Sequence, residues 1–118
     1  LKDHPKIQKT IFPGLSDFSQ KKLVEKQMGG FGNMISFYIK GDKNKTFKFL
    51  NSLSIVSISN NLGDVKSLII HPATTTHLKI LNKDKNFLNI NNNLVRLSVG
   101  LEDTEDIIED INLALKKI

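Results

Sequence analysis

The chain has 118 residues, of which 39% are hydrophobic and 25% are charged, and it contains no cysteine. This length is enough for one domain with its own core, and the composition is typical of a soluble globular protein. Disulfides and thiolate chemistry are excluded, no apolar run approaches the ~18 residues of a membrane span, and no secretory signal is recognisable. We therefore expect a cytoplasmic protein that does not contact membranes.

The net charge of +5 is unevenly distributed along the chain. Residues 1–50 contain ten lysines and four acidic residues, whereas residues 51–118 contain seven basic and eight acidic residues. The lysines are scattered and have no aromatic residues between them, which argues against a nucleic-acid partner. Sixteen of the seventeen basic residues are lysine, so Arg96 is the only side chain with a planar guanidinium fork.

The first part of the chain predicts a strand followed by a helix. Residues 6–12 are extended because His4-Pro5 and Phe12-Pro13-Gly14 break helices on both sides. The helix is capped by Ser16 or Ser19 and ends at Gly29-Gly30. Its expected inward face consists of Leu23, Val24, Gln27 and Met28.

A second strand and a second helix follow. Residues 31–40 alternate as a strand whose strongly apolar face contains Ile35, Phe37 and Ile39. The helix starts at Gly41-Asp42 and has apolar residues at helical spacing, namely Phe47, Leu50 and Leu53.

Three short apolar segments predict further strands. The first two are residues 55–58 and 67–70, which are joined by a loop at residues 60–64. The third is residues 94–99, in which side chains alternate between two faces: Leu94, Arg96 and Ser98 on one, and Val95, Leu97 and Val99 on the other.

The remaining segments predict a surface loop and a last helix. Residues 79–93 are rich in Lys, Asn and Asp, and the expected anchors of this loop are Phe87, Leu88 and Ile90. The last helix is capped by Asp103, and its expected buried stripe is Ile107, Ile108, Ile111 and Leu115. Together these elements predict an α+β fold, a small and mostly antiparallel sheet with helices packed on one face.

Three residue clusters resemble functional motifs but lack the required spacing. His71 and His77 are six residues apart, which fits neither a helical metal site nor a zinc knuckle, so we expect them to bond to loop backbone. The segment Gly29-Gly30-Phe31-Gly32 lacks the preceding strand and following helix of a phosphate cradle. The acidic residues between 102 and 110 predict a capped, solvated helix face. We therefore expect neither a metal site nor a complete catalytic constellation.

Arg96 has two interpretations on residue chemistry alone. In the first, it is a structural residue that bonds to backbone or to a nearby acidic side chain. In the second, its guanidinium binds a carboxylate or phosphate that is delivered to the face of the sheet.

Three segments of the chain together resemble one enzyme family. They are residues 4–37, with HPKI, FPGL and QMGGFGNMISF, residues 61–77, NLGDVKSLIIHPATTTH, and residues 94–103, LVRLSVGLED. They are similar to the C-terminal domain of the pyridoxal-phosphate enzymes of cysteine and methionine metabolism, which include cystathionine synthases and lyases, methionine γ-lyase and O-acetylhomoserine sulfhydrylase. The NLGD, IHPA and TTH sequences look most like the sulfhydrylase, because the other members more often have Ser-Leu-Gly and Ser-Met-Thr-His.

The resemblance implies that residues 1–118 are a small C-terminal domain and that a large pyridoxal-phosphate-binding domain is absent from this chain. It implies no catalytic or cofactor-binding residue here and assigns the substrate carboxylate to Arg96, with Asn61 contributing mainly backbone and Thr76 lying near the pocket. The implied partners are the large domain and an amino-acid substrate, in a homotetramer of the full enzyme. The chain alone is expected to be inactive.

The implied reaction of the full enzyme replaces the acetate of O-acetylhomoserine by sulfide and gives homocysteine. Two alternatives stay open. The first is the C-terminal domain of cystathionine γ-synthase, cystathionine lyase or methionine γ-lyase, and the second is a non-catalytic remnant that acts as an assembly module.

Overall fold

Five strands form one sheet in the computed structural model, which describes residues 1–80 and 82–118. Their order is β1-β2-β5-β4-β3. The bounds are β1 Ile7–Ile11, β2 Met34–Ile39, β3 Ser57–Ile58, β4 Leu68–Ile70 and β5 Leu94–Ser98. The pairs β1–β2, β2–β5 and β4–β5 are antiparallel, and only β3–β4 is parallel among these described pairs. The prediction of a mostly antiparallel sheet is therefore confirmed.

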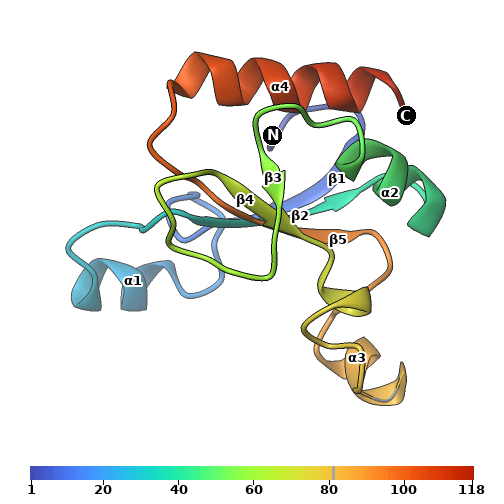
Figure 1. Ribbon diagram of the computed structural model, residues 1–118. Helices are drawn as coiled ribbons and strands as arrows, with labels where there is room; N and C mark the ends of the chain where they lie inside the picture. The colour runs from blue at the N-terminus through green and yellow to red at the C-terminus, as the bar shows by residue number, and fades with distance from the viewer. Residues whose placement is uncertain (81) are drawn as a thin grey trace.

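Two helices cover one face of this sheet (Figure 1). They are α2, Lys43–Leu50, and α4, Thr104–Lys116. The core between them and the sheet contains Phe37 and Ile39 of β2, Val95 and Leu97 of β5, and buried side chains of both helices, including Phe49, Leu50, Ile107, Ile111, Ala114 and Leu115. The α+β class, with helices packed on one face, is confirmed. Among the described residues, no helix is long and apolar enough to span a membrane.

The N-cap and the apolar stripe of the last helix match their prediction except at two apolar positions. Asp103 caps α4 by accepting a hydrogen bond from the Glu105 N–H at 2.9 Å. Ile107, Ile111 and Leu115 are buried as expected, but Ile108 is 46% exposed and Ala114 is fully buried instead. A helix of this length packs only a narrow stripe, and Ile108 lies just outside it.

The expectation that the acidic residues near α4 are all solvated is wrong for Asp110. This side chain is 5% exposed, and its carboxylate accepts hydrogen bonds from the N–H groups of Ser54, Ile55 and Val56 at 2.8–3.0 Å. These contacts also explain why β3 is shorter than the predicted strand at residues 55–58. The N–H groups at its expected start bind a carboxylate rather than a neighbouring strand.

The first helix, α1, is shorter than predicted and largely exposed. It spans Lys21–Gln27, and neither Ser16 nor Ser19 caps it, because Gln20 holds the N-cap position without a side-chain hydrogen bond. Of its expected inward face, Val24 is buried, whereas Leu23 and Met28 are 45% and 43% exposed. Figure 1 shows the reason, since α1 projects away from the layer formed by α2 and α4. Residues 28–33 separate α1 from β2, so β2 begins three residues later than the predicted strand at residues 31–40.

The predicted loop at residues 79–93 contains a short helix, α3, Asn82–Phe87. Of the expected anchors, Ile90 is buried, but Phe87 is 85% exposed and Leu88 is 50% exposed. Leu81, which belongs to the same predicted loop, lies outside the described residues. A 3-10 turn, η1, Pro72–Thr74, connects β4 to this region, which projects below the sheet in Figure 1.

Candidate functional site

Arg96 lies in the middle of β5, on the face opposite the α2–α4 layer. Its neighbours Val95 and Leu97 point into the core, so the alternation of a strand directs Arg96 to the other side. Ser36 of β2 and Ile70 of β4 lie directly opposite it on the adjacent strands. The side chain is half-buried. No hydrogen bond or ion pair joins its guanidinium to another residue within the part of the chain that the structure describes. This geometry gives no support to the structural interpretation of Arg96.

Asn61 lies in the exposed connection between β3 and β4. Its backbone N–H donates to the hydroxyl of Ser59 at 3.2 Å. Two residues later, the N–H of Gly63 donates to the hydroxyl of Ser98 at 2.9 Å. Ser98 and Arg96 are two residues apart on β5 and share a face. The segment that contains Asn61 is therefore fixed to the strand and the face that carry Arg96.

Thr76 follows η1 and is exposed. Its hydroxyl lies 2.8 Å from Nδ1 of His77. The η1 residue Ala73 belongs to the same buried apolar cluster as Leu94, which lies at the start of β5 and on the face of Arg96. The structure thus brings the segments of Asn61 and Thr76 to the two ends of β5, with Arg96 between them.

His71 and His77 make local contacts. Nε2 of buried His71 is 2.9 Å from the carbonyl oxygen of Asn92, and its Nδ1 is 2.7 Å from the hydroxyl of Thr74. The expected bond from His71 to loop backbone is present, whereas His77 contacts a threonine hydroxyl. No group of three or more metal-binding side chains occurs among residues 1–80 and 82–118.

Polar residues that the sequence analysis did not single out hold the same region together. Both carboxylate oxygens of Glu102 accept hydrogen bonds from Ser67, one from its N–H at 2.7 Å and one from its hydroxyl at 2.8 Å. The N–H bond from Ser67 is the main cause that lowers the pKa of Glu102. Ser98 could have been found from its alternation with Arg96, but no sequence pattern links Ser67 to Glu102.

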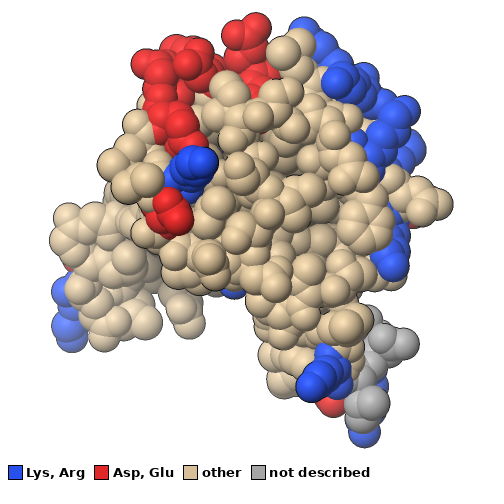
Figure 2. Space-filling model, in the orientation of Figure 1, with Lys and Arg blue, Asp and Glu red and all other residues tan. Residues whose placement is uncertain are grey.

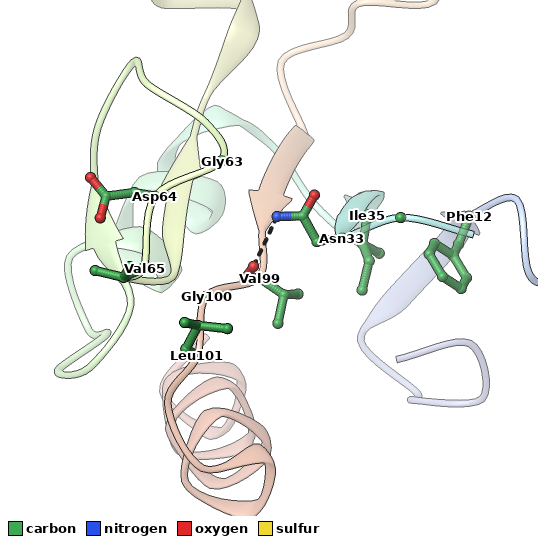
Figure 3. A pocket seen from close by; sticks show the side chains of 10 residues that line it. Phe12, Asn33, Ile35, Gly63, Asp64, Val65, Val99, Gly100 and Leu101 are labelled. Carbon is green, nitrogen blue, oxygen red and sulfur yellow. Dashed lines mark hydrogen bonds between the residues drawn. The ribbon is translucent and has the colours of Figure 1, made fainter. Parts of the chain in front are cut away.

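A cavity of about 500 Å³ lies beside the C-terminal end of β5. Its lining is mostly apolar and includes Phe12, Ile35, Val65, Val99 and Leu101, and it contains none of the three candidate residues. In Figure 3 the carboxylate of Asp64 points away from this apolar side. The amide of Asn33 donates to the carbonyl oxygen of Val99 at 3.0 Å at the edge of the cavity.

Charge is separated along the helical side of the molecule. Figure 2 shows acidic side chains gathered over one end of α4 and basic side chains around the other end. The acidic residues begin at Glu102 and continue through the first turns of α4, which complements the positive end of the helix dipole. This charge lies on the face away from Arg96.

Comparisons with known proteins identify relatives along nearly the whole chain. The family model described as Cys/Met metabolism PLP-dependent enzyme matches residues 1–116. Cystathionine gamma-lyase of Mus musculus is 41% identical over 116 residues, which cover 98% of this chain and 29% of the relative. L-methionine gamma-lyase of Fusobacterium nucleatum subsp. nucleatum is 43% identical over 118 residues, which cover 100% of this chain and 30% of the relative. The chain spans less than a third of the length of these curated relatives, and it belongs to the family of pyridoxal-phosphate-dependent enzymes of cysteine and methionine metabolism.

Proposed function

We propose that this chain is the C-terminal domain of a pyridoxal-phosphate enzyme that acts on γ-substituted amino acids, and that Arg96 binds the carboxylate of the substrate. The observation that supports the proposal is the guanidinium of Arg96, which has no partner among the described residues and stands on the face not covered by α2 and α4. Asn61 contributes backbone from the segment fixed at Ser98, and Thr76 completes the site from the other end of β5.

The residues of this chain do not fit the cofactor itself. Pyridoxal phosphate is the cofactor of the family and supplies the electron sink for reactions at the amino-acid carbons. A lysine that holds it covalently needs a shielded position that lowers its pKa, and none of the lysines whose side chains the structure describes is buried. The cofactor would therefore be held by the large domain, which corresponds to the remaining length of the relatives.

A planar donor suits this reaction better than a point charge. Loss of a proton from the α-carbon requires the broken bond to stand at a fixed angle to the conjugated system, and the plane of the carboxylate helps to set that angle. An arginine donates two parallel hydrogen bonds and fixes this plane, whereas a lysine leaves it free to rotate.

The named relatives favour γ-elimination as the reaction of the full enzyme. Both are called gamma-lyases. Elimination at the γ-carbon breaks the bond to sulfur and releases a thiol, and hydrolysis of the remaining imine by one water gives ammonia and a 2-oxo acid. The second candidate is the sulfhydrylase reaction, in which sulfide replaces acetate on O-acetylhomoserine, and its support is the sequence Asn61-Leu62-Gly63-Asp64. Assays of the full-length enzyme with L-methionine, L-cystathionine, or O-acetylhomoserine and sulfide distinguish the two.

We also propose a cytoplasmic homotetramer as the assembly of the full enzyme. The assembly-module alternative requires that the intact protein have no activity on any of these substrates. Activity of the full-length enzyme with one of them would exclude it.

The test of the carboxylate site is Arg96→Lys in the full-length enzyme. Replacing two parallel hydrogen bonds by one rotatable charge is expected to lower kcat/KM for the amino-acid substrate by about 30-fold. Arg96→Gln, which lacks the charge, is expected to lose more, while circular dichroism and thermal unfolding stay close to wild type for both variants. Unchanged kinetics in Arg96→Lys would make Arg96 a structural residue.

A further inference from the structure

The connection between β3 and β4, residues 59–67, is held at two separate points, one at the last residue of β5 and one in the segment that follows it. Near its C-terminal end, the carbonyl oxygen of Val65 accepts a hydrogen bond from the N–H of Leu101 at 2.8 Å, and Ser67 binds Glu102 and Gly100. The backbone passes so close to Gly100 that a Cβ there would lie 2.4–2.5 Å from backbone atoms of residues 65–67. This first attachment depends on residues beyond the end of β5.

The second attachment holds the half of the connection that contains Asn61, and it depends on Ser98. The side chain of Ser98 is buried, with 2% of the residue exposed, and its hydroxyl accepts from the N–H of Gly63 at 2.9 Å and from the amide of Asn33 at 3.3 Å. A hydroxyl has two acceptor lone pairs, so these two donors use both. The amide of Asn33 also donates to the carbonyl oxygen of Val99, which holds Asn33 in place.

We propose that Ser98 is a positioning residue for the substrate carboxylate, a role that rests on the proposed function of Arg96. One short strand carries both groups: Arg96 supplies the charged donor, and Ser98 fixes the Asn61–Gly63 backbone on the same face. Without the hydroxyl, this half of the connection keeps the bond from Ser59 to the carbonyl oxygen of Ile69 at its start and the local bond from Asn61 to Ser59. The Asn61–Gly63 segment then loses its described hydrogen bond to β5, and with it its fixed position relative to the guanidinium. A smaller fraction of the enzyme molecules then has both parts of the site in place. The apparent dissociation constant of the substrate rises in inverse proportion to that fraction.

The test compares Ser98→Ala with Ser67→Ala in the full-length enzyme. Both remove one buried serine hydroxyl from the same region, but only the Ser98 hydroxyl binds the N–H of Gly63. Ser98→Ala is expected to raise KM for the amino-acid substrate about fivefold with kcat within about threefold of wild type. Ser67→Ala is expected to lower thermal stability and to leave KM within about twofold. Hydrogen exchange of the Gly63 amide should be faster in Ser98→Ala only.

A pair of inhibitors separates positioning from a general structural effect. L-Norleucine and n-pentylamine have the same side chain and amine, but only norleucine has the carboxylate. In Ser98→Ala, Ki for norleucine is expected to rise about fivefold and Ki for pentylamine to stay unchanged. Asn33→Ala, a change at an exposed residue, is also expected to raise Ki for norleucine. In the double variant, the two increases in binding free energy should not add fully, because both substitutions act through the hydroxyl of Ser98.

Two outcomes would overturn the proposal and leave the function of Arg96 intact. One is an unchanged KM in Ser98→Ala together with faster exchange at Gly63, and the other is an equal rise of Ki for both inhibitors. If Arg96→Lys also left norleucine binding unchanged, the proposed carboxylate site itself would fail.

Discussion

Glu102 joins the end of β5 to the start of β4 through both of its carboxylate oxygens. Each oxygen accepts one hydrogen bond from Ser67, a residue with no exposed surface. The ionised carboxylate is the form that accepts both bonds, which is why the pKa of Glu102 lies below its ordinary value of 4.5.

The stability of the chain should therefore depend on pH through Glu102. Because its pKa is lowered by folding, its contribution is complete above the unfolded value and is lost as pH falls through the folded value. Glu102→Gln is expected to be less stable than wild type at about pH 7, and the difference should shrink as pH falls below the ordinary carboxyl value and through the lowered pKa of Glu102. Urea unfolding at several pH values measures this. Glu109→Gln, at an exposed position of α4, is the control. If the stability difference between Glu102→Gln and wild type stayed the same at every pH, the prediction would be contradicted.

The position of a single side chain could be predicted from the sequence only where the periodicity of a strand or helix assigns it to one face of that element. Arg96 stood out by composition and by alternation within β5, and the structure has it on the predicted face. The contacts of Glu102 with Ser67, 35 residues earlier, depend on how β4 and β5 pair. No local pattern contains that information.

Asp110 connects two elements, α4 and the chain entering β3. Its buried carboxylate binds three successive backbone N–H groups, so it replaces the strand partner that these groups would otherwise need. The contact fixes where α4 lies along the sheet and where β3 begins.

Asp110→Ala is expected to lower the free energy of unfolding by about 3 kcal/mol, since it leaves N–H groups without acceptors, including the buried one of Val56. Glu109→Ala, one residue earlier on an exposed position, is expected to change it by less than about 0.5 kcal/mol. Chemical denaturation of both variants checks the difference. Equal effects of the two substitutions would mean that the three hydrogen bonds of Asp110 contribute nothing measurable to the free energy of unfolding.

The elements that were predicted correctly are those that pack on the sheet. The central strands β2 and β5 and the helix α4 have apolar side chains at the period of their own geometry, and all three contribute to the core. The helix α1 and the segment around α3 project from the sheet, so of their expected apolar contacts only Val24 and Ile90 are buried. Periodicity identifies a potential inward face, but only the packing of the whole chain decides whether something lies opposite it.

At the scale of the molecule, the main apolar core and Arg96 lie on opposite faces of the sheet. Its inner face, against α2 and α4, holds most of the buried apolar residues, and its outer face carries Arg96. The outer face has a smaller apolar cluster around Tyr38 and Leu94, near η1. Under the proposed function, the site on the outer face would use the cofactor and reacting groups of a second domain.

The 118-residue chain alone is therefore expected to have no catalytic activity. Mixed with pyridoxal phosphate, it should show no visible absorbance from a lysine-bound cofactor that borohydride can fix, because none of the lysines with a described side chain is buried. Absorption spectra before and after borohydride, followed by peptide mass spectrometry, measure this. A single lysine modified in stoichiometric yield would contradict the assignment of the cofactor to the large domain.

The division between the two faces also affects how such an enzyme can change over evolutionary time. Arg96 and its opposite neighbour Ser36 are half-buried and lie outside the main core, so their replacement removes little packing. Under the proposed function, substitutions around Arg96 can change how a ligand is bound at a smaller cost in folding free energy than substitutions in the inner layer. The inner layer can then stay the same while binding on the outer face changes.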